Sequence, residues 1–355
     1  MKIVLSAIVI HAIYQTALSL TSAPQPVHTL LLCRHGDSIW NGGQPGTQET
    51  FTGWTDVPLS QKGITEARNT AEELALYSHG IDACFTSILG RAKETAHYCC
   101  WAFAEKPFFT EPKKYVSDYR LNERHYGALQ GYIKSHVEQG LHGHDYKSVQ
   151  EWRRSWYAVP PLLTGDDPRR IKEVQQFANY CGGIENVPYG ESLEMVANNR
   201  IRPFLDNVLH PIMSEAAESK QMQSLNGDGD RNNIGGCGLV VAHANSLRAL
   251  IGVICQVEKD EVALKRLEAM KIQTGVPLVL KYKQLEDGSY QACDLTEVGS
   301  ISNQVGSPDL PVWPLSCIPK NQRMGQSHVH YSRSTETEKK LGKRQGALKI
   351  RIDVI

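Results

Sequence analysis

The fold is decided by the stretch VHTLLLCRHG, which runs from Val27 to Gly36. A short apolar run without charges is typical of a strand that is buried on both faces of a parallel sheet. Polar side chains follow at once, in Arg34 and His35. Because ligands bind at the carboxyl ends of strands in open α/β sheets, this stretch predicts a buried strand that ends at a functional site.

Similar apolar runs recur along the chain and alternate with helical patterns. Further strands are predicted at Ile81–Ser87, near Tyr115, at Gly238–Ala242 and, as the last one, at Pro277–Tyr282. Helices are predicted from a Ser60 cap to Tyr77, from Arg91 to Ala104, and from a Ser246 cap to Cys255. This alternation predicts an α/β fold, a three-layer α/β/α sandwich in which helices flank a mostly parallel sheet.

The chain of 355 residues has the composition of a globular protein, with 41% hydrophobic and 21% charged residues. Lys+Arg and Asp+Glu balance at 38 each, so no bulk charge indicates nucleic acid or an anionic membrane as a partner. The globular pattern spans residues 27–300. Residues 301–355 begin with closely spaced prolines and continue as a polar, basic tail, which we expect to be disordered.

Residues 1–26 are predicted to be a targeting segment. Lys2 precedes the apolar run Ile3–Ile10, and small residues follow around Ser22, which is the pattern of a signal peptide. The run is too short and mixed for a stable membrane span. We expect entry into the secretory route or an organelle such as a plastid; the alternative is a disordered extension on a cytoplasmic protein. The nine cysteines form no CxxC pair, which indicates buried thiols in a reducing compartment.

Four side chains at three strand ends form the predicted catalytic site. Arg34 and His35 follow the first strand, Arg91 follows the second, and His243 follows the fourth. Helices that begin close by offer free N–H groups to an anion. Histidine can attack phosphorus and arginine can hold phosphate oxygens, so this set is suited to phosphoryl transfer. The alternative is that all four are ordinary surface residues.

Eight segments carry a resemblance to the 2,3-bisphosphoglycerate-dependent phosphoglycerate mutases of the histidine phosphatase superfamily. They follow the family order and span about Val27 to Leu280: RHGDSIWN (Arg34–Asn41), FTGWTDVPLSQKG (Phe51–Gly63), TSILGRA (Thr86–Ala92), RLNERHYGALQG (Arg120–Gly131), WRRS (Trp152–Ser155), ESL (Glu191–Leu193), AHANSLRAL (Ala242–Leu250) and TGVPLV (Thr274–Val279). The resemblance implies a phosphoglycerate mutase-like fold. It also implies an isomerase that interconverts 2- and 3-phosphoglycerate through a phosphohistidine, in glycolysis and gluconeogenesis.

The resemblance implies a role for each matching residue. His35 would be the nucleophile, Glu123 the general acid and base, and Arg34, Arg91 and His243 would surround the transferring phosphoryl group. Asn41 would bind its oxygens, and Thr52 and Gly53 would contact the substrate carboxylate. The other anionic end would be held by Arg124, Tyr126, Lys134, Arg153 and Arg154, with Ala244 and Asn245 adding contacts near His243. The primer would be 2,3-bisphosphoglycerate, with no metal; partners would be small phosphoglycerates, and a homo-oligomer would be common for the family.

The chain departs from the family pattern at several places. Asp37 stands where glutamate is usual, Ala244 stands where glycine is usual, and the loop at residues 42–50 is longer. Alanine would be strained at position 244 if that position needs a positive φ. A poorly closed site would admit water to phosphorylated His35 and favour hydrolysis. The alternatives are therefore a histidine phosphatase or bisphosphoglycerate synthase on the same fold, and a catalytically dead binding protein.

Overall fold

A computed structural model describes residues 25–77, 80–104, 112–225 and 235–297 of the chain. The predicted targeting segment, except for residues 25 and 26, and the predicted C-terminal tail lie outside these residues. Within the four described ranges, no helix has both the length and the apolar character needed to cross a membrane.

Six strands form one mixed sheet in the order β3-β2-β4-β1-β5-β6. Their bounds are His28–Arg34 (β1), Ala83–Thr86 (β2), Lys114–Ser117 (β3), Cys237–Ala242 (β4), Leu278–Gln284 (β5) and Tyr290–Glu297 (β6). The first four strands are parallel to one another, whereas β5 and β6 are antiparallel to their neighbours. The α/β fold is therefore confirmed. The prediction that the strand at Pro277–Tyr282 is the last one was wrong, since β6 follows it.

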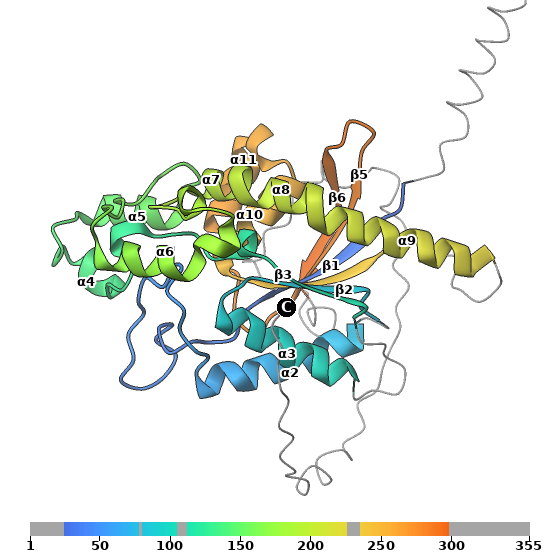
Figure 1. The fold of residues 1–355 in the computed structure, drawn as a ribbon, viewed down its shortest axis with the longest axis horizontal. Helices are drawn as coiled ribbons and strands as arrows, with labels where there is room; N and C mark the ends of the chain where they lie inside the picture. Colours follow the sequence, from blue (N-terminus) through green and yellow to red (C-terminus); the bar gives the residue numbers. More distant parts are fainter. Residues whose placement is uncertain (1–24, 78–79, 105–111, 226–234, 298–355) are drawn as a thin grey trace, which may run out of the picture. The chain divides into compact units, whose positions relative to one another are not determined.

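Successive side chains of β1 enter two different cores. Leu30 and Leu32 belong to the cluster that contains Trp156 and Phe204. Leu31 belongs to the cluster on the opposite face, with side chains of α2 (Gln61–Tyr77) and α3 (Gly90–Ala104). Figure 1 shows α2 and α3 on one side of the sheet, and α9 (His210–Leu225) and α10 (Ala244–Ile254) on the other. Apolar burial on both faces explains the three layers.

The other helices cover the sheet or extend beyond the strand ends. They are α4 (Lys134–Glu138), α5 (Tyr146–Arg154), α6 (Pro168–Cys181), α7 (Leu193–Val196), α8 (Arg202–Phe204) and α11 (Glu261–Ala269), with short 3-10 turns at Tyr119–Leu121, Gly127–Leu129, Ile184–Asn186 and Val257–Lys259. From α7 to α9 the helix is continuous and contains two π-helical segments, Ala197–Ile201 and Leu205–Leu209. Such segments are frequent near functional sites.

The starts of two helices determine how the site is presented. The Ser60 hydroxyl accepts a hydrogen bond from the Gly63 N–H at 3.1 Å, as expected for a cap of α2. Ser246 does not cap α10, contrary to the prediction. The cap is His243, and the Ser246 hydroxyl, one turn inside the helix, accepts from the His243 N–H at 3.1 Å. Ala244 begins the helix without a positive φ, so alanine is not strained there.

Candidate active site

The ends of three neighbouring strands gather the predicted catalytic residues. The register pairs Arg34 of β1 with Ala242 of β4, and Thr86 of β2 with Val241 of β4. His35 and His243 therefore leave the sheet side by side, and their ring centroids lie 4.9 Å apart. Ser87, which follows β2, places its hydroxyl 2.8 Å from Nε2 of His243.

The hydrogen bonding and charge around His35 prepare one ring nitrogen for attack. Nδ1 lies 2.7 Å from the carbonyl oxygen of Gly36, and because a carbonyl can only accept, Nδ1 carries the proton. Nε2 is then the nitrogen with a free lone pair. Burial, followed by the charges of Arg91 and Arg34, lowers the pKa of His35 well below its ordinary value of 6.5. The ring is therefore neutral and nucleophilic at neutral pH.

Two arginines next to His35 are held by backbone carbonyls. Arg91 donates to the oxygens of Gly53 and Thr55, both at 2.9 Å, and Arg34 donates to the oxygen of Ile272 at 3.0 Å. Burial lowers the pKa of Arg91 to about 10, so it stays charged at neutral pH. The two guanidinium groups provide a fixed positive field for a phosphoryl group.

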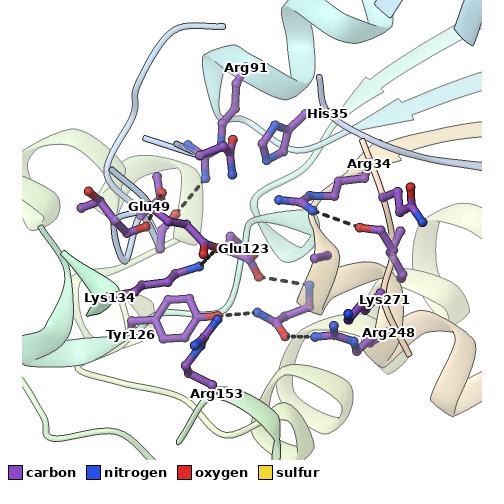
Figure 2. Close-up of a pocket in the computed structure, with 18 of the residues that line it drawn as sticks. Arg34, His35, Glu49, Arg91, Glu123, Tyr126, Lys134, Arg153, Arg248 and Lys271 are labelled. Atoms are coloured by element: carbon purple, nitrogen blue, oxygen red, sulfur yellow. Dashed lines mark hydrogen bonds and ion pairs between the residues drawn. The ribbon is translucent and has the colours of Figure 1, made fainter. Parts of the chain in front are cut away.

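A pocket of about 290 Å³ opens in front of these groups. Thirteen of the predicted site residues line it: Arg34, His35, Asn41, Thr52, Gly53, Arg91, Glu123, Tyr126, Lys134, Arg153, Arg154, Ala244 and Asn245. Figure 2 shows Arg34, His35 and Arg91 at one end, Lys134 and Arg153 at the other, and Glu123 between them. The pocket thus has cations at both ends with Glu123 between them, and a second carboxylate, Glu49, beside Lys134.

Two predicted residues do not line this pocket. Arg124 is fully buried, donates to the carbonyl oxygens of Trp152 and Arg153, and lies over the Tyr126 ring, 4.8 Å from its centroid. Both carbonyls bind Nη2, whereas Nε and Nη1 have no hydrogen-bond partner among the described residues. His243 is also fully buried, and its Nδ1 has no hydrogen-bond partner among the described residues.

Glu123 is held by two backbone donors. One carboxylate oxygen accepts from the N–H of Arg124 at 2.7 Å and from the N–H of Asn245 at 3.3 Å. Its carbonyl oxygen accepts from the Trp54 indole at 2.7 Å and from Arg200 at 3.2 Å. With one carboxylate oxygen occupied, the other is available to exchange a proton with a ligand hydroxyl.

Residues that the sequence reasoning missed complete the lining. They are Glu49, Thr50, Arg248, Lys271, Ile272 and Gln273. Arg248 donates to the side chain of Asn245 at 2.7 Å; it lies three residues after Asn245 in the same helix, and this spacing was a usable signal. Lys271 lies in the loop before β5, where no pattern marked it. Among the described residues, no three His, Cys, Asp or Glu side chains are grouped as a metal site.

Comparison with known proteins identifies the family. Residues 30–173 match the histidine phosphatase superfamily (branch 1). The 2,3-bisphosphoglycerate-dependent phosphoglycerate mutase 2 of Lactiplantibacillus plantarum is 34% identical over 255 residues, which is 72% of this chain and 94% of the relative. The corresponding mutase of Wigglesworthia glossinidia brevipalpis is 30% identical over 259 residues, 71% of this chain and 92% of the relative.

A solved structure of a mycobacterial glucosyl-3-phosphoglycerate phosphatase covers 75% of this chain and 97% of its own, with 19% identity and a TM-score of 0.48. That similarity is too low to add to the assignment, which rests on the two sequence relatives. On their evidence, the chain belongs to the histidine phosphatase superfamily.

Proposed function

We propose that this protein is a 2,3-bisphosphoglycerate-dependent phosphoglycerate mutase that interconverts 2- and 3-phosphoglycerate through phosphorylated His35. The observation that carries the proposal is the division of the pocket into two cation groups with Glu123 between them (Figure 2). 3-Phosphoglycerate has two anionic groups, a phosphate and a carboxylate, with a hydroxyl between them, and 2-phosphoglycerate has the phosphate and the hydroxyl exchanged. The pocket has a complementary group for each.

The phosphoryl group is bound and transferred at the His35 end. Nε2 of His35 attacks phosphorus, the bond from phosphorus to the ester oxygen breaks, and Arg34 and Arg91 hold the equatorial oxygens. His243 adds a neutral ring next to His35, because burial and the charge of Arg91 lower its pKa well below 6.5.

Glu123 acts as the general base and then the general acid for the substrate hydroxyl. When phospho-His35 donates to the substrate hydroxyl, Glu123 takes the hydroxyl proton and the N–P bond breaks. When the other phosphoryl group returns to His35, Glu123 gives the proton back to the oxygen that leaves. Between the two transfers the bound bisphosphoglycerate reorients, and Lys134, Arg153 and Arg154 hold the anionic end that lies away from His35. Because His35 is phosphorylated between the two transfers, the reaction is ping-pong in character.

The lining also suits 2,3-bisphosphoglycerate, which when bound supplies the phosphoryl group that primes His35. Two carboxylates, Glu49 and Glu123, line the pocket against seven cations: Arg34, Arg91, Lys134, Arg153, Arg154, Arg248 and Lys271. Such an excess of positive charge matches a ligand with two phosphates and a carboxylate. No proposed step uses a metal ion.

Purified protein supplied with 3-phosphoglycerate and catalytic 2,3-bisphosphoglycerate tests the proposal. We expect 2-phosphoglycerate to form faster than inorganic phosphate, and H35N to abolish the reaction. The control H97N changes an exposed histidine of α3 away from the pocket and should retain full activity. Phosphate release faster than 2-phosphoglycerate formation would instead assign a phosphatase. Net formation of 2,3-bisphosphoglycerate when 1,3-bisphosphoglycerate is added as phosphoryl donor would assign a synthase.

A further inference from the structure

One acidic side chain, Glu49, lies in the second cation group, which is formed by Lys134, Arg153 and Arg154 at the end of the pocket away from His35. Glu49 lines the pocket, and its carboxylate forms an ion pair with the Lys134 ammonium at 2.5 Å (Figure 2). Burial tends to raise the pKa of Glu49, but the charges of Lys134, Arg153 and Arg34 outweigh it and the pKa is lowered. Glu49 is therefore ionised at neutral pH and competes directly with any other anion for Lys134.

The backbone keeps Glu49 at this position. The Lys134 N–H donates to the Glu49 carbonyl oxygen at 2.8 Å, and Thr50 forms a β-bridge with Ile133. Next to this bridge, the Phe51 N–H donates to the Tyr132 carbonyl oxygen at 2.9 Å. Since the main chains on both sides are joined, the Glu49–Lys134 pair can open only by rotation of a side chain.

We propose that Glu49 is a specificity-determining residue, because its carboxylate holds the place on Lys134 that the second anionic group of the substrate takes. The inference rests on the proposed function and adds the step by which the ligand enters the second cation group. Binding then exchanges one carboxylate for another on the same ammonium group. Only a ligand with a second anionic group can make this exchange.

The exchange is feasible because the Glu49 side chain is 48% exposed, whereas Lys134 is 17% exposed. The carboxylate can therefore turn into water, and pairs with this exposure are weak. Glu138 offers a contrast. It pairs with Arg153 of the same cation group but does not line the pocket, so a ligand can bind Arg153 without displacing it.

Selectivity follows from this difference. Inorganic phosphate, which needs only Arg34, Arg91 and His35, leaves the Glu49–Lys134 pair intact. A ligand with an uncharged far end meets the Glu49 carboxylate and gains no ion pair. A ligand such as 3-phosphoglycerate replaces Glu49 on Lys134 and restores the lost pair with its own anion.

Titration calorimetry on E49Q and E138Q tests the proposal, with 3-phosphoglycerate and inorganic phosphate as the two probes. Glutamine keeps the shape of glutamate and removes the competing charge. We expect E49Q to lower the Kd of 3-phosphoglycerate about threefold to tenfold while the Kd of inorganic phosphate changes by less than about twofold. E138Q should change neither Kd by more than about twofold.

Three results would overturn the proposal. E49Q could leave the Kd of 3-phosphoglycerate unchanged or raise it, which would make Glu49 a partner that orients Lys134. E49Q and E138Q could lower that Kd equally, which would indicate a general charge effect. The wild-type protein could fail to bind 3-phosphoglycerate at all, which would overturn the proposed function as well; the first two results leave that function standing.

Discussion

The Ser87 hydroxyl lies 2.8 Å from Nε2 of His243 and joins the end of β2 to the end of β4. The same hydroxyl accepts from the Leu89 N–H at 3.3 Å, so it is fixed from both sides. Because the His243 ring lies beside His35, this bond orients a neutral histidine toward the place where phosphoryl transfer would occur.

Loss of the Ser87 hydroxyl should reduce the rate of transfer. We expect S87A to lower kcat about tenfold, with a smaller change in KM, because one oriented hydrogen bond is lost at the reacting end of the pocket. S117A is the matched control, since the Ser117 hydroxyl donates only to the Ser87 carbonyl oxygen, at 3.3 Å, and should alter kcat by less than about twofold. Equal effects of the two variants would contradict the role given to Ser87.

Alanine would be strained at position 53 for two reasons, the backbone angle and the space for a Cβ atom. The φ of Gly53 is +51°, and a Cβ there would lie 1.8 Å from the side-chain oxygen of Gln130. Its carbonyl oxygen also holds Arg91. We expect G53A to lower both kcat/KM by at least about tenfold and the free energy of unfolding by more than about 1 kcal/mol. Gly131 has a φ of +86° but open space around it, so G131A should show the backbone strain alone.

The buried pair of Arg200 and Glu191 should hold the peptide that carries Glu123. Arg200 is 4% exposed, donates to both oxygens of Glu191 at 2.8 Å, and also donates to the carbonyl oxygens of Asn122 and Glu123. R200K cannot make this set of bonds. We expect kcat to fall at least about tenfold and the free energy of unfolding to fall by roughly 3 kcal/mol.

Arg202 provides the comparison for Arg200, because it lies two residues on and makes an exposed pair with Glu258 at 2.9 Å. R202K should change the free energy of unfolding, measured with urea, by less than about 1 kcal/mol. A similar small effect of R200K would show that the buried pair does not position Glu123.

Stability should fall as the solution becomes acidic. Burial, then the charges of His210 and Lys220, lowers the pKa of His28 from 6.5 to about 4. Between these values the unfolded chain binds a proton at His28 and the folded chain does not, so the free energy of unfolding falls as pH falls from 6.5 toward 4, by at most about 3 kcal/mol. Urea unfolding at pH 7.5, 6 and 5 should show a steeper decline for wild type than for H28Q. Parallel declines would be inconsistent with this account.

The strand ends were predictable because each lay where an apolar run gave way to polar side chains. His35 and His243 both follow such runs, and parallel pairing then brings them together. The antiparallel β6 was not predictable in the same way, since its sequence YQACDLTE mixes polar and apolar residues without a continuous apolar run. The Ser246 error had a local cause: serine usually marks the N-cap, whereas here it stands at the third helical position, which glutamate or glutamine usually fills in a capping box.

The contacts that individual side chains make in the pocket were harder to predict from the sequence. Arg124 stands in the same motif as Glu123, yet its guanidinium is directed to backbone carbonyls. Glu49 lies in a polar loop whose pairing with Ile133 depends on a bridge between segments far apart in the chain. Patterns along the sequence report which face of an element is buried, and they do not report which long-range partner a charged side chain will meet.

In the proposed reaction, His35 carries the phosphoryl group between substrates. The most direct measurement is to incubate the protein with 2,3-bisphosphoglycerate labelled in its phosphates, isolate the protein, map the label, and then add unlabelled 3-phosphoglycerate. We expect about one label per chain on Nε2 of His35, none in H35N, and transfer of that label into phosphoglycerate faster than into inorganic phosphate. Label on another residue, or no label on a folded protein, would contradict it.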